Sequence, residues 1–184
     1  MYKISGGSKL LDVELILKKT QLKQGQEVAD LGCGKTGFFI FPMADIIGNY
    51  GIVYAVDILK TTLETIDRRI KLDNIKNIKT VWSNLEIFNA TNIESGSLDA
   101  VLLVNTLYQS QKRVEILRES IRMLKIGGKL VIVDWNDSSI PIGPAPRERV
   151  HYENLITGAQ KLGLLLEDEF VPGQCHYGVV FSKQ

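Results

Sequence analysis

The stretch Glu27-Val28-Ala29-Asp30-Leu31-Gly32-Cys33-Gly34-Lys35-Thr36-Gly37 is the part of the chain from which the fold can be predicted. An apolar run that contains an acid leads into a glycine-rich turn, and the apolar residues that follow are able to open a helix. A strand, a tight glycine turn and a helix N-terminus together make a cradle for a nucleotide-bearing ligand. In that cradle Gly32 can take a positive φ, Gly34 lets a ligand approach the backbone, and Gly37 lets the helix lie close to the strand.

The composition is that of an ordinary water-soluble protein and predicts one domain over residues 1–184. Hydrophobic residues make up 45% of the chain and charged residues 23%, and the net charge is +1, so global charge gives no argument for a nucleic acid or a membrane as partner. The two cysteines, Cys33 and Cys175, lack metal-ligand spacing, so no metal site is expected. The N-terminus has no apolar signal core, and the longest apolar stretch, around residues 98–107, is too short and too polar to span a bilayer. We therefore expect a cytoplasmic location.

Strand-like and helix-like segments alternate along most of the chain. Strands are expected at residues 27–31, 52–57, 78–82, 99–104 and 129–135, and helices at residues 8–22 (capped by Ser8), 36–47, 61–72, 114–124 and 148–162, with a short helix near residues 85–88. Residues 125–128, Lys-Ile-Gly-Gly, are interpreted as a glycine stop after the fourth long helix. This alternation predicts an α/β fold with a mainly parallel, doubly wound sheet.

The last two expected strands, residues 164–170 and 177–182, break the alternation. They flank Pro172-Gly173, which is a hairpin-like signal, so one strand near the C-terminus is expected to run antiparallel. The sheet is therefore predicted to have seven strands.

Polar residues follow several of the apolar strands, where ligands bind in open α/β sheets. Asp57 ends the second strand about twenty residues after Gly37, and a carboxylate there can accept hydrogen bonds from both hydroxyls of a ribose. NAD and S-adenosylmethionine both carry such a ribose. Asp30 would repel a pyrophosphate but suits a cationic ammonium or sulfonium group, which disfavours NAD. The helical segment within residues 1–24 is expected to close over this site.

Four motifs in order resemble those of class I S-adenosylmethionine-dependent methyltransferases, most closely the ubiquinone/menaquinone-biosynthesis group. They are Val28-Ala29-Asp30-Leu31-Gly32-Cys33-Gly34-x-x-Gly37, Val53-Tyr54-Ala55-Val56-Asp57, Leu98-Asp99-Ala100-Val101-Leu102-Leu103-Val104-Asn105 and Leu124-Lys125-Ile126-Gly127-Gly128-Lys129-Leu130, the last with Ile126 where that family usually has proline. The resemblance covers almost the whole chain and implies a Rossmann-like fold and a methyl-transfer reaction that uses S-adenosylmethionine as cofactor.

The resemblance also implies roles for individual residues. Asp30 and the backbone of the glycine turn would hold the methionine part of the cofactor, Asp57 the ribose hydroxyls, and Ile58 the adenine ring. Asn84 would accept a hydrogen bond from the adenine amino group, and Asn105 would lie near the methionine amino group. The full set of expected cofactor-binding residues is Asp30, Gly32, Cys33, Gly34, Gly37, Phe38, Asp57, Ile58, Asn84, Leu85 and Asn105.

The methyl acceptor is expected to be a small molecule. Residues 105–108 read Asn-Thr-Leu-Tyr, unlike the N-P-P-Y of enzymes that methylate adenine or glutamine amides, and no Pro-Cys pair supplies the nucleophile of cytosine-C5 enzymes. No catalytic base is assigned; the candidates are Tyr108, Asp134, Asp137, His151 and His176, and Trp135, Tyr108 and Tyr177 are candidates to line an acceptor pocket. Two alternatives stay open, an RNA or protein methyltransferase and a non-catalytic module that binds the cofactor. An NAD-dependent oxidoreductase is a distant fourth.

Overall fold

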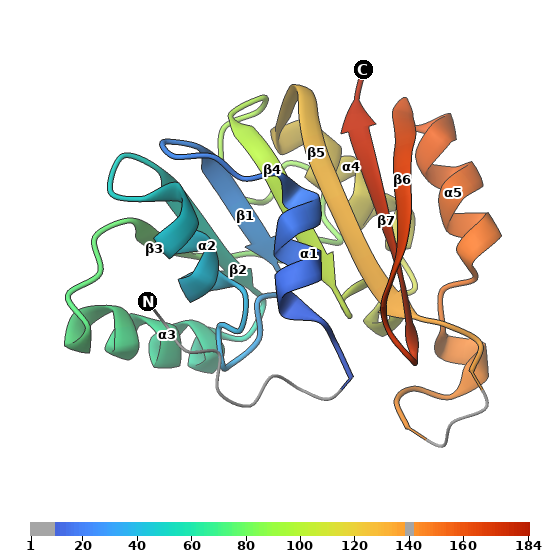
Figure 1. Ribbon diagram of the computed structural model, residues 1–184, viewed down its shortest axis with the longest axis horizontal. Coiled ribbons are helices and arrows are strands. Elements are labelled where there is room, and N and C mark those ends of the chain that lie inside the picture. The colour runs from blue at the N-terminus through green and yellow to red at the C-terminus, as the bar shows by residue number, and fades with distance from the viewer. Residues whose placement is uncertain (1–9, 139–141) are drawn as a thin grey trace.

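A single seven-stranded sheet forms the centre of the computed structural model, which describes residues 10–138 and 142–184 (Figure 1). Its strands are β1 Glu27–Leu31, β2 Ile52–Asp57, β3 Ile78–Trp82, β4 Leu98–Val104, β5 Leu124–Trp135, β6 Leu164–Gly173 and β7 His176–Lys183. They lie in the order β3-β2-β1-β4-β5-β7-β6, and β7 runs antiparallel to both of its neighbours whereas the other pairs are parallel. The predicted mainly parallel sheet with one antiparallel strand near the C-terminus is confirmed.

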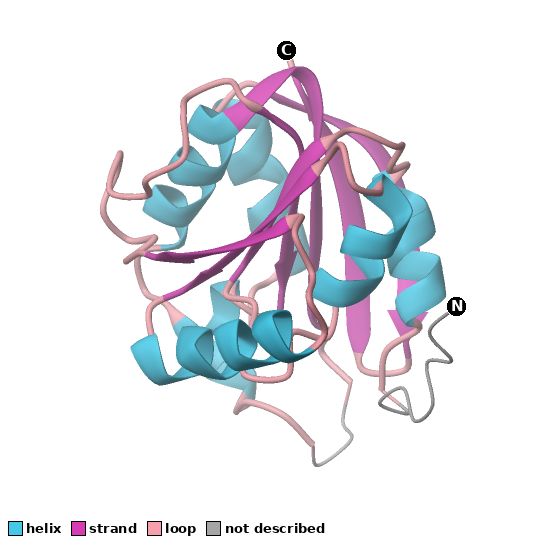
Figure 2. Cartoon of the chain, turned by 90° about the vertical axis from the view of Figure 1, so that its left-hand side faces the viewer, coloured by secondary structure: helices cyan, strands magenta, loops and turns pink. Residues whose placement is uncertain are grey.

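Helices cover both faces of the sheet, as the view along its edge shows (Figure 2). They are α1 Val13–Thr20, α2 Ile40–Ile47, α3 Lys60–Leu72, α4 Arg113–Met123 and α5 Tyr152–Lys161, with short 3-10 helices η1 Leu107–Gln109 and η2 Pro146–Glu148. Buried side chains of α1, α2 and α3 share one hydrophobic core with one face of the sheet, and those of α4 and α5 share a second core with the other face.

The strand β5 shows why the central strands are apolar without interruption. Val131 and Val133 belong to the core on the α1–α3 side, and Leu130 and Ile132 to the core on the α4–α5 side. Side chains alternate between the faces of a strand, so a strand covered on both faces needs an apolar residue at every position. All four of these residues are completely buried.

Several expected boundaries differ from the observed ones. The helix expected over residues 36–47 begins only at Ile40 because residues 35–39 form turns, and the helix expected over 148–162 begins at Tyr152 because η2 is a separate turn. No helix forms near residues 85–88, which are turns. The prediction that Ser8 caps the first helix was wrong: Asp12 is the cap, and its Oδ1 accepts a hydrogen bond of 2.9 Å from the backbone N of Leu15. Ser8 itself lies outside the described residues.

Residues 125–128 were expected to form a glycine stop at the end of a helix, but they lie within β5. The helix α4 passes directly into β5 at Leu124, and the pairing with β4 then jumps from Leu98↔Leu124 to Ala100↔Lys129. Gly127, at φ +76°, stands in the resulting bulge, where a residue without a Cβ carries the left-handed backbone without strain.

Candidate functional site

The turn after β1 is held tightly against its two neighbouring strands. The backbone N of Gly32 and of Cys33 both donate hydrogen bonds to the carbonyl O of Val56, at 2.8 and 3.0 Å. On the other side Thr106 Oγ1 donates to the carbonyl O of Leu31 at 2.9 Å. A Cβ on Gly32, which has φ +80°, would lie 2.7 Å from that Thr106 oxygen, so this position needs glycine for two independent reasons.

Gly34, by contrast, faces open space. It has φ +65°, and a Cβ built on it would meet no atom within 4 Å. Its backbone N donates a 3.1 Å hydrogen bond to Oδ2 of Asp57, whose Oδ1 accepts a 2.9 Å bond from the backbone N of Leu59. Asp57 is 8% exposed, and each of its oxygens retains a lone pair for a further donor. The carboxylate therefore joins the glycine turn to the loop after β2 while remaining able to bind a ligand.

A cavity of about 530 Å³ opens beside this turn, at the carboxyl ends of β1 to β4. Its lining residues are Gly32, Gly34, Lys35, Asp57, Ile58, Leu59, Thr61, Thr62, Ser83, Asn84, Leu85, Glu86, Thr106, Gln109, Ser110 and Ile116. Six of the residues expected to bind a cofactor are among them, namely Gly32, Gly34, Asp57, Ile58, Asn84 and Leu85. The volume is within the range of small-molecule and cofactor sites.

Five of the expected residues do not line this cavity. Cys33 is buried, and burial, with added repulsion from Asp30 and Asp57, raises the pKa of its thiol far above the ordinary value, so the thiol is unreactive. A Cβ on Gly37, which has φ +59°, would lie 2.8 Å from the ring of Phe41, so this glycine makes room for a side chain of α2. Phe38 lies edge-on to a neighbouring phenylalanine and packs against the core.

Asp30 and Asn105, the other two, lie behind the turn. Asp30 is 2% exposed, and burial together with the nearby Asp57 charge raises its pKa to about 7. Its Oδ2 and the Oδ1 of Asn105 are buried without a hydrogen-bond partner among the described residues. Asn105 has φ +54°, and its carbonyl O accepts a 2.7 Å hydrogen bond from Gln109 Nε2.

Most of the lining residues that the sequence analysis missed follow directly from those it found. Lys35, Leu59 and Glu86 extend the turns after β1, β2 and β3. The strand-end rule places Ser83 and Thr106 at this edge, although they were not among the expected cofactor-binding residues. Thr61 and Thr62 belong to α3 and Ile116 to α4, and no signal in the sequence shows which turn of a helix reaches a cavity.

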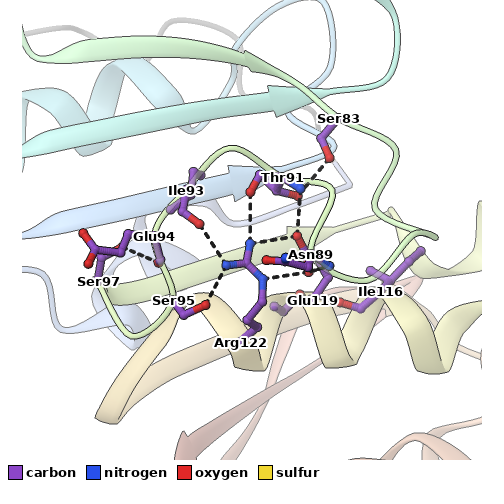
Figure 3. A network of polar contacts seen from close by, with 11 residues as sticks. Ser83, Asn89, Thr91, Ile93, Glu94, Ser95, Ser97, Ile116, Glu119 and Arg122 are labelled. Carbon is purple, nitrogen blue, oxygen red and sulfur yellow. Dashed lines mark hydrogen bonds and ion pairs between the residues drawn. The ribbon is translucent and has the colours of Figure 1, made fainter.

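The connection between β3 and β4, which carries four of the lining residues, is fastened to α4 by a buried ion pair (Figure 3). Glu119, 0% exposed, accepts hydrogen bonds from the backbone N of Asn89 at 2.6 Å and of Thr91 at 2.9 Å. Arg122 pairs with both oxygens of Glu119 at 2.9 Å and donates to the carbonyl O of Thr91 and of Ile93. These contacts hold residues 89–93, which directly follow the segment expected to be helical, against α4.

The candidate bases lie in different environments, all outside this cavity. Asp134 is completely buried, and burial raises its pKa to about 6 although the backbone N of Trp135 and of Tyr108 donate hydrogen bonds to it. His151 and Asp137 face each other at 3.8 Å on the surface. His176 is 1% exposed.

The remaining acceptor-pocket candidates are partly used in packing. Tyr177 Oη donates a 3.0 Å hydrogen bond to the carbonyl O of Val150. Burial, the largest effect, raises the pKa of the Tyr108 hydroxyl. The ring of Tyr108 lies edge-on to that of Trp135, with 6.5 Å between centroids.

The first helix lies away from the cavity. α1 packs over β5, β6 and β7 in the core that it shares with α2 and α3, and Lys19 pairs with Asp168 of β6 at 2.5 Å. None of residues 10–24 lines the cavity. The prediction that residues 1–24 cover the site stays a prediction for residues 1–9, which lie outside the described part of the chain.

The described residues, 10–138 and 142–184, contain neither a metal centre nor a membrane-spanning helix. No three His, Cys, Asp or Glu side chains among them are grouped closely enough to hold a metal ion. No helix in these ranges has the length and apolar character needed to cross a membrane.

Comparison with known proteins yields one family and many structural neighbours. A family model described as the ubiE/COQ5 methyltransferase family matches residues 7–159. The demethylmenaquinone methyltransferase of Lactococcus lactis subsp. lactis (strain IL1403) is 30% identical over 118 residues, which cover 64% of this chain and 45% of that protein. The chain thus spans about half the length of the curated relatives it matches.

Among solved structures, a SAM dependent methyltransferase from Aquifex aeolicus has a TM-score of 0.85 at 23% identity, covering 96% of this chain and 92% of that one. A geranyl diphosphate C-methyltransferase from Streptomyces coelicolor A3(2), in complex with Mg2+, geranyl diphosphate and S-adenosyl-L-homocysteine, has a TM-score of 0.76 at 13% identity over 94% and 78% of the two chains. These similarities show a common fold.

Proposed function

Because the chain belongs to the ubiE/COQ5 methyltransferase family, we propose that it transfers a methyl group from S-adenosylmethionine to a small-molecule acceptor of the quinone class. One observation carries the proposal. Two buried carboxylates, Asp30 and Asp57, lie on either side of a glycine turn that opens into a cavity at the carboxyl ends of the strands. The quinone class is inferred from the names of the relatives, which are demethylmenaquinone methyltransferases.

The residues at the cavity fit the cofactor in charge and in hydrogen-bonding capacity. Asp57 would bind the ribose hydroxyls, because both of its oxygens are fixed by backbone N–H groups and each can accept another bond. Ile58, 53% exposed on the rim, would pack against the adenine ring, and Leu85 lies within the same lining. Asn84 Oδ1 already accepts a 3.0 Å bond from the backbone N of Glu86 and keeps one lone pair for an amino group.

Asp30 and the turn would hold the methionine end. Burial raises the pKa of the Asp30 carboxyl to about 7, and an ammonium group of the cofactor would stabilise its ionised form. Gly32 and Gly34 leave the backbone accessible beside it, and Asn105 has a buried oxygen free to accept a hydrogen bond. The bound cofactor supplies an electrophilic methyl group on a cationic sulfur, and the chain contributes orientation and charge.

Isothermal titration calorimetry with S-adenosylmethionine, S-adenosylhomocysteine and NAD tests the cofactor. The first two are expected to bind, whereas preference for NAD, or binding of none of the three, would contradict the proposal. Asp57→Ala is expected to weaken cofactor binding by about 1–3 kcal/mol, the scale of hydrogen bonds to a charged group. Asp45→Ala, on the exposed side of α2, is the matched control and should leave the affinity unchanged.

A turnover assay tests the proposed methyl acceptor. Reduced demethylmenaquinone offered with S-adenosylmethionine is expected to give a methylated product and S-adenosylhomocysteine, both measurable by mass spectrometry. Cofactor binding without transfer to this acceptor, but with salt-sensitive binding of RNA, would favour a nucleic-acid substrate instead. Cofactor binding without any transfer would favour a non-catalytic binding module.

A further inference from the structure

Asp30, Asn105 and Trp135 each have a buried side-chain polar atom without a hydrogen-bond partner within the described part of the chain, and the buried ring of His176 has the backbone of Leu10 as partner for one of its two nitrogens. All four lie at one edge of the sheet. Asp30 is the penultimate residue of β1, Asn105 follows β4, Trp135 ends β5, and His176 begins the antiparallel β7. An unpaired buried polar atom costs about 1–3 kcal/mol, so such atoms are rare and call for a partner. Their grouping at the ligand-binding edge points to a ligand as that partner.

Three of these side chains share one face of the sheet. Pairing of β1 with β4 places Asp30 beside Leu102, and pairing of β4 with β5 places Leu102 beside Val131. Because side chains alternate along a strand, Trp135, four residues beyond Val131, lies on the same face. His176 is the direct pairing partner of Trp135 and therefore lies on that face as well.

Packing holds the Trp135 and His176 rings in fixed positions. Their centroids are 4.2 Å apart with the planes inclined at 38°, and the two residues are 8% and 1% exposed. Gly143 lies against the benzo part of the indole so closely that a Cβ there would be 2.5 Å from the ring. Tyr108 meets the indole edge-on. The indole and the imidazole are therefore held in fixed positions beside each other.

The chemistry of these groups selects a neutral ligand that both donates and accepts hydrogen bonds. Burial lowers the pKa of His176 to about 4, against a smaller opposing effect from the backbone of Leu10, so the ring is neutral at pH 7. A neutral imidazole has one donor and one acceptor; the donor is engaged by the backbone of Leu10, so His176 is left with an acceptor, and the indole of Trp135 offers a donor only. A hydroxyl group, which is both donor and acceptor, matches this set, and a ligand with two oxygens can satisfy both rings.

We propose that Trp135 and His176 bind the methyl acceptor, and that they recognise a neutral aromatic ring carrying hydroxyl groups. The inference rests on the proposed function and deepens it by naming the residues that select the acceptor. His176 accepts a hydrogen bond from an acceptor hydroxyl, and the Trp135 N–H donates one to an acceptor oxygen. Asp30, proposed above to hold the methionine end of the cofactor, lies on the same face of the sheet as these two rings.

The test uses 1,4-naphthohydroquinone as probe, titrated anaerobically into the full chain saturated with S-adenosylhomocysteine. Wild type is expected to bind it, and Trp135→Phe and His176→Phe are each expected to weaken binding roughly tenfold, the effect of losing one buried hydrogen bond. Affinity for S-adenosylhomocysteine should stay within about twofold of wild type, and in turnover the loss should appear in KM. His151→Phe is the matched control, since His151 is the only other histidine and is exposed.

A second probe keeps the test decisive if a variant does not fold. 1,4-Dimethoxynaphthalene has the same ring without hydroxyl donors, so wild type should bind it roughly tenfold more weakly than the hydroquinone. Equal affinity for both probes, or no binding of either to the S-adenosylhomocysteine complex, would overturn the assignment of Trp135 and His176. Absence of S-adenosylhomocysteine binding would instead overturn the proposed function, so the two failures are distinguishable.

Discussion

Replacing Arg122 by methionine is expected to lower the free energy of unfolding by about 3–5 kcal/mol, the loss typical when one partner of a buried ion pair is removed. The side chains of Arg122 and Glu119 are 8% and 0% exposed, so water cannot take over the lost contacts. Methionine keeps most of the volume but none of the donors. Glu119 would then keep its donors from the β3–β4 connection, which are two backbone N–H groups and the side chain of Thr91.

The pKa of Glu119 gives an independent magnitude. Burial acts to raise that pKa, but hydrogen bonds from Arg122 and from the backbone of Thr91 and Asn89 outweigh burial and lower it from 4.5 to about 2. The lowering corresponds to about 3 kcal/mol shared among all of these donors, so the part that Arg122 supplies is smaller. Because the folded pKa is the lower one, this stabilisation is present in full above about pH 5 and is lost as the pH falls toward 2. The difference between wild type and variant should shrink over that same range.

Urea denaturation followed by circular dichroism measures the effect, with Arg118→Met as control. Arg118 lies on the same helix and pairs with Glu115 at 3.3 Å, but its side chain is 50% exposed, so its loss should cost at most about 1 kcal/mol. The double variant Arg122→Met/Glu119→Leu should recover part of the stability, because no unpaired charge stays buried. A loss for Arg122→Met no larger than that for Arg118→Met would refute the reasoning.

Three further predictions concern Asp30 at the site, the glycine turn after β1, and the hydrogen bonds that Asn77 donates at the end of α2. Burial raises the pKa of Asp30 to about 7, and a cationic ligand binds its ionised form, so the calorimetric affinity for S-adenosylmethionine should rise up to tenfold per pH unit between about pH 5 and 7 and then level off. Asp30→Asn should remove this pH dependence, and a flat wild-type profile would exclude the ion pair. Gly32→Ala should destabilise the chain by about 2–4 kcal/mol in thermal unfolding, because it adds a clash with Thr106 to the strain of a positive φ. Gly25→Ala, at the same φ of +80° but with open space around it, should cost only about 1 kcal/mol, and equal losses for the two variants would contradict the clash. Asn77→Ala should cost about 1–2 kcal/mol in the same assay, since Asn77 Nδ2 donates hydrogen bonds of 2.8 and 3.0 Å to two carbonyl groups at the end of α2, and an unchanged midpoint would show those bonds to be unimportant.

The bounds of β1, β2 and β3 were predicted, and those of β4, α3 and α4 to within one residue, whereas the starts of α1, α2, α5 and β5 were not. For the central strands the reason is that a strand covered on both faces is largely apolar and ends where polar residues begin. The segment near residues 85–88 has local helix-forming character, but the residues that follow it, Asn89, Thr91 and Ile93, are hydrogen-bonded to Glu119 and Arg122 of α4. Such distant partners leave no trace in the local pattern, and neither does the bulge at Gly127.

The candidate site shows the same division. The turn at Gly32 and Gly34, and Asp57 at the end of β2, could be placed on one cavity because the carboxyl ends of parallel strands meet at one edge. Trp135 and His176 could be listed as candidates but not brought together. Their contact depends on the antiparallel register of β7 against β5, which no local signal between these distant residues specifies.

The position of β7 between β5 and β6 also has a consequence for how the chain assembles. During synthesis β6 emerges before the strand that joins it to the sheet, so β5 has an unpaired edge until β7 arrives. The hairpin of β6 and β7 must therefore dock late, and a nascent chain halted before residue 176 would present an open apolar edge to other chains. Chaperones that shield strand edges are expected to matter most in that interval.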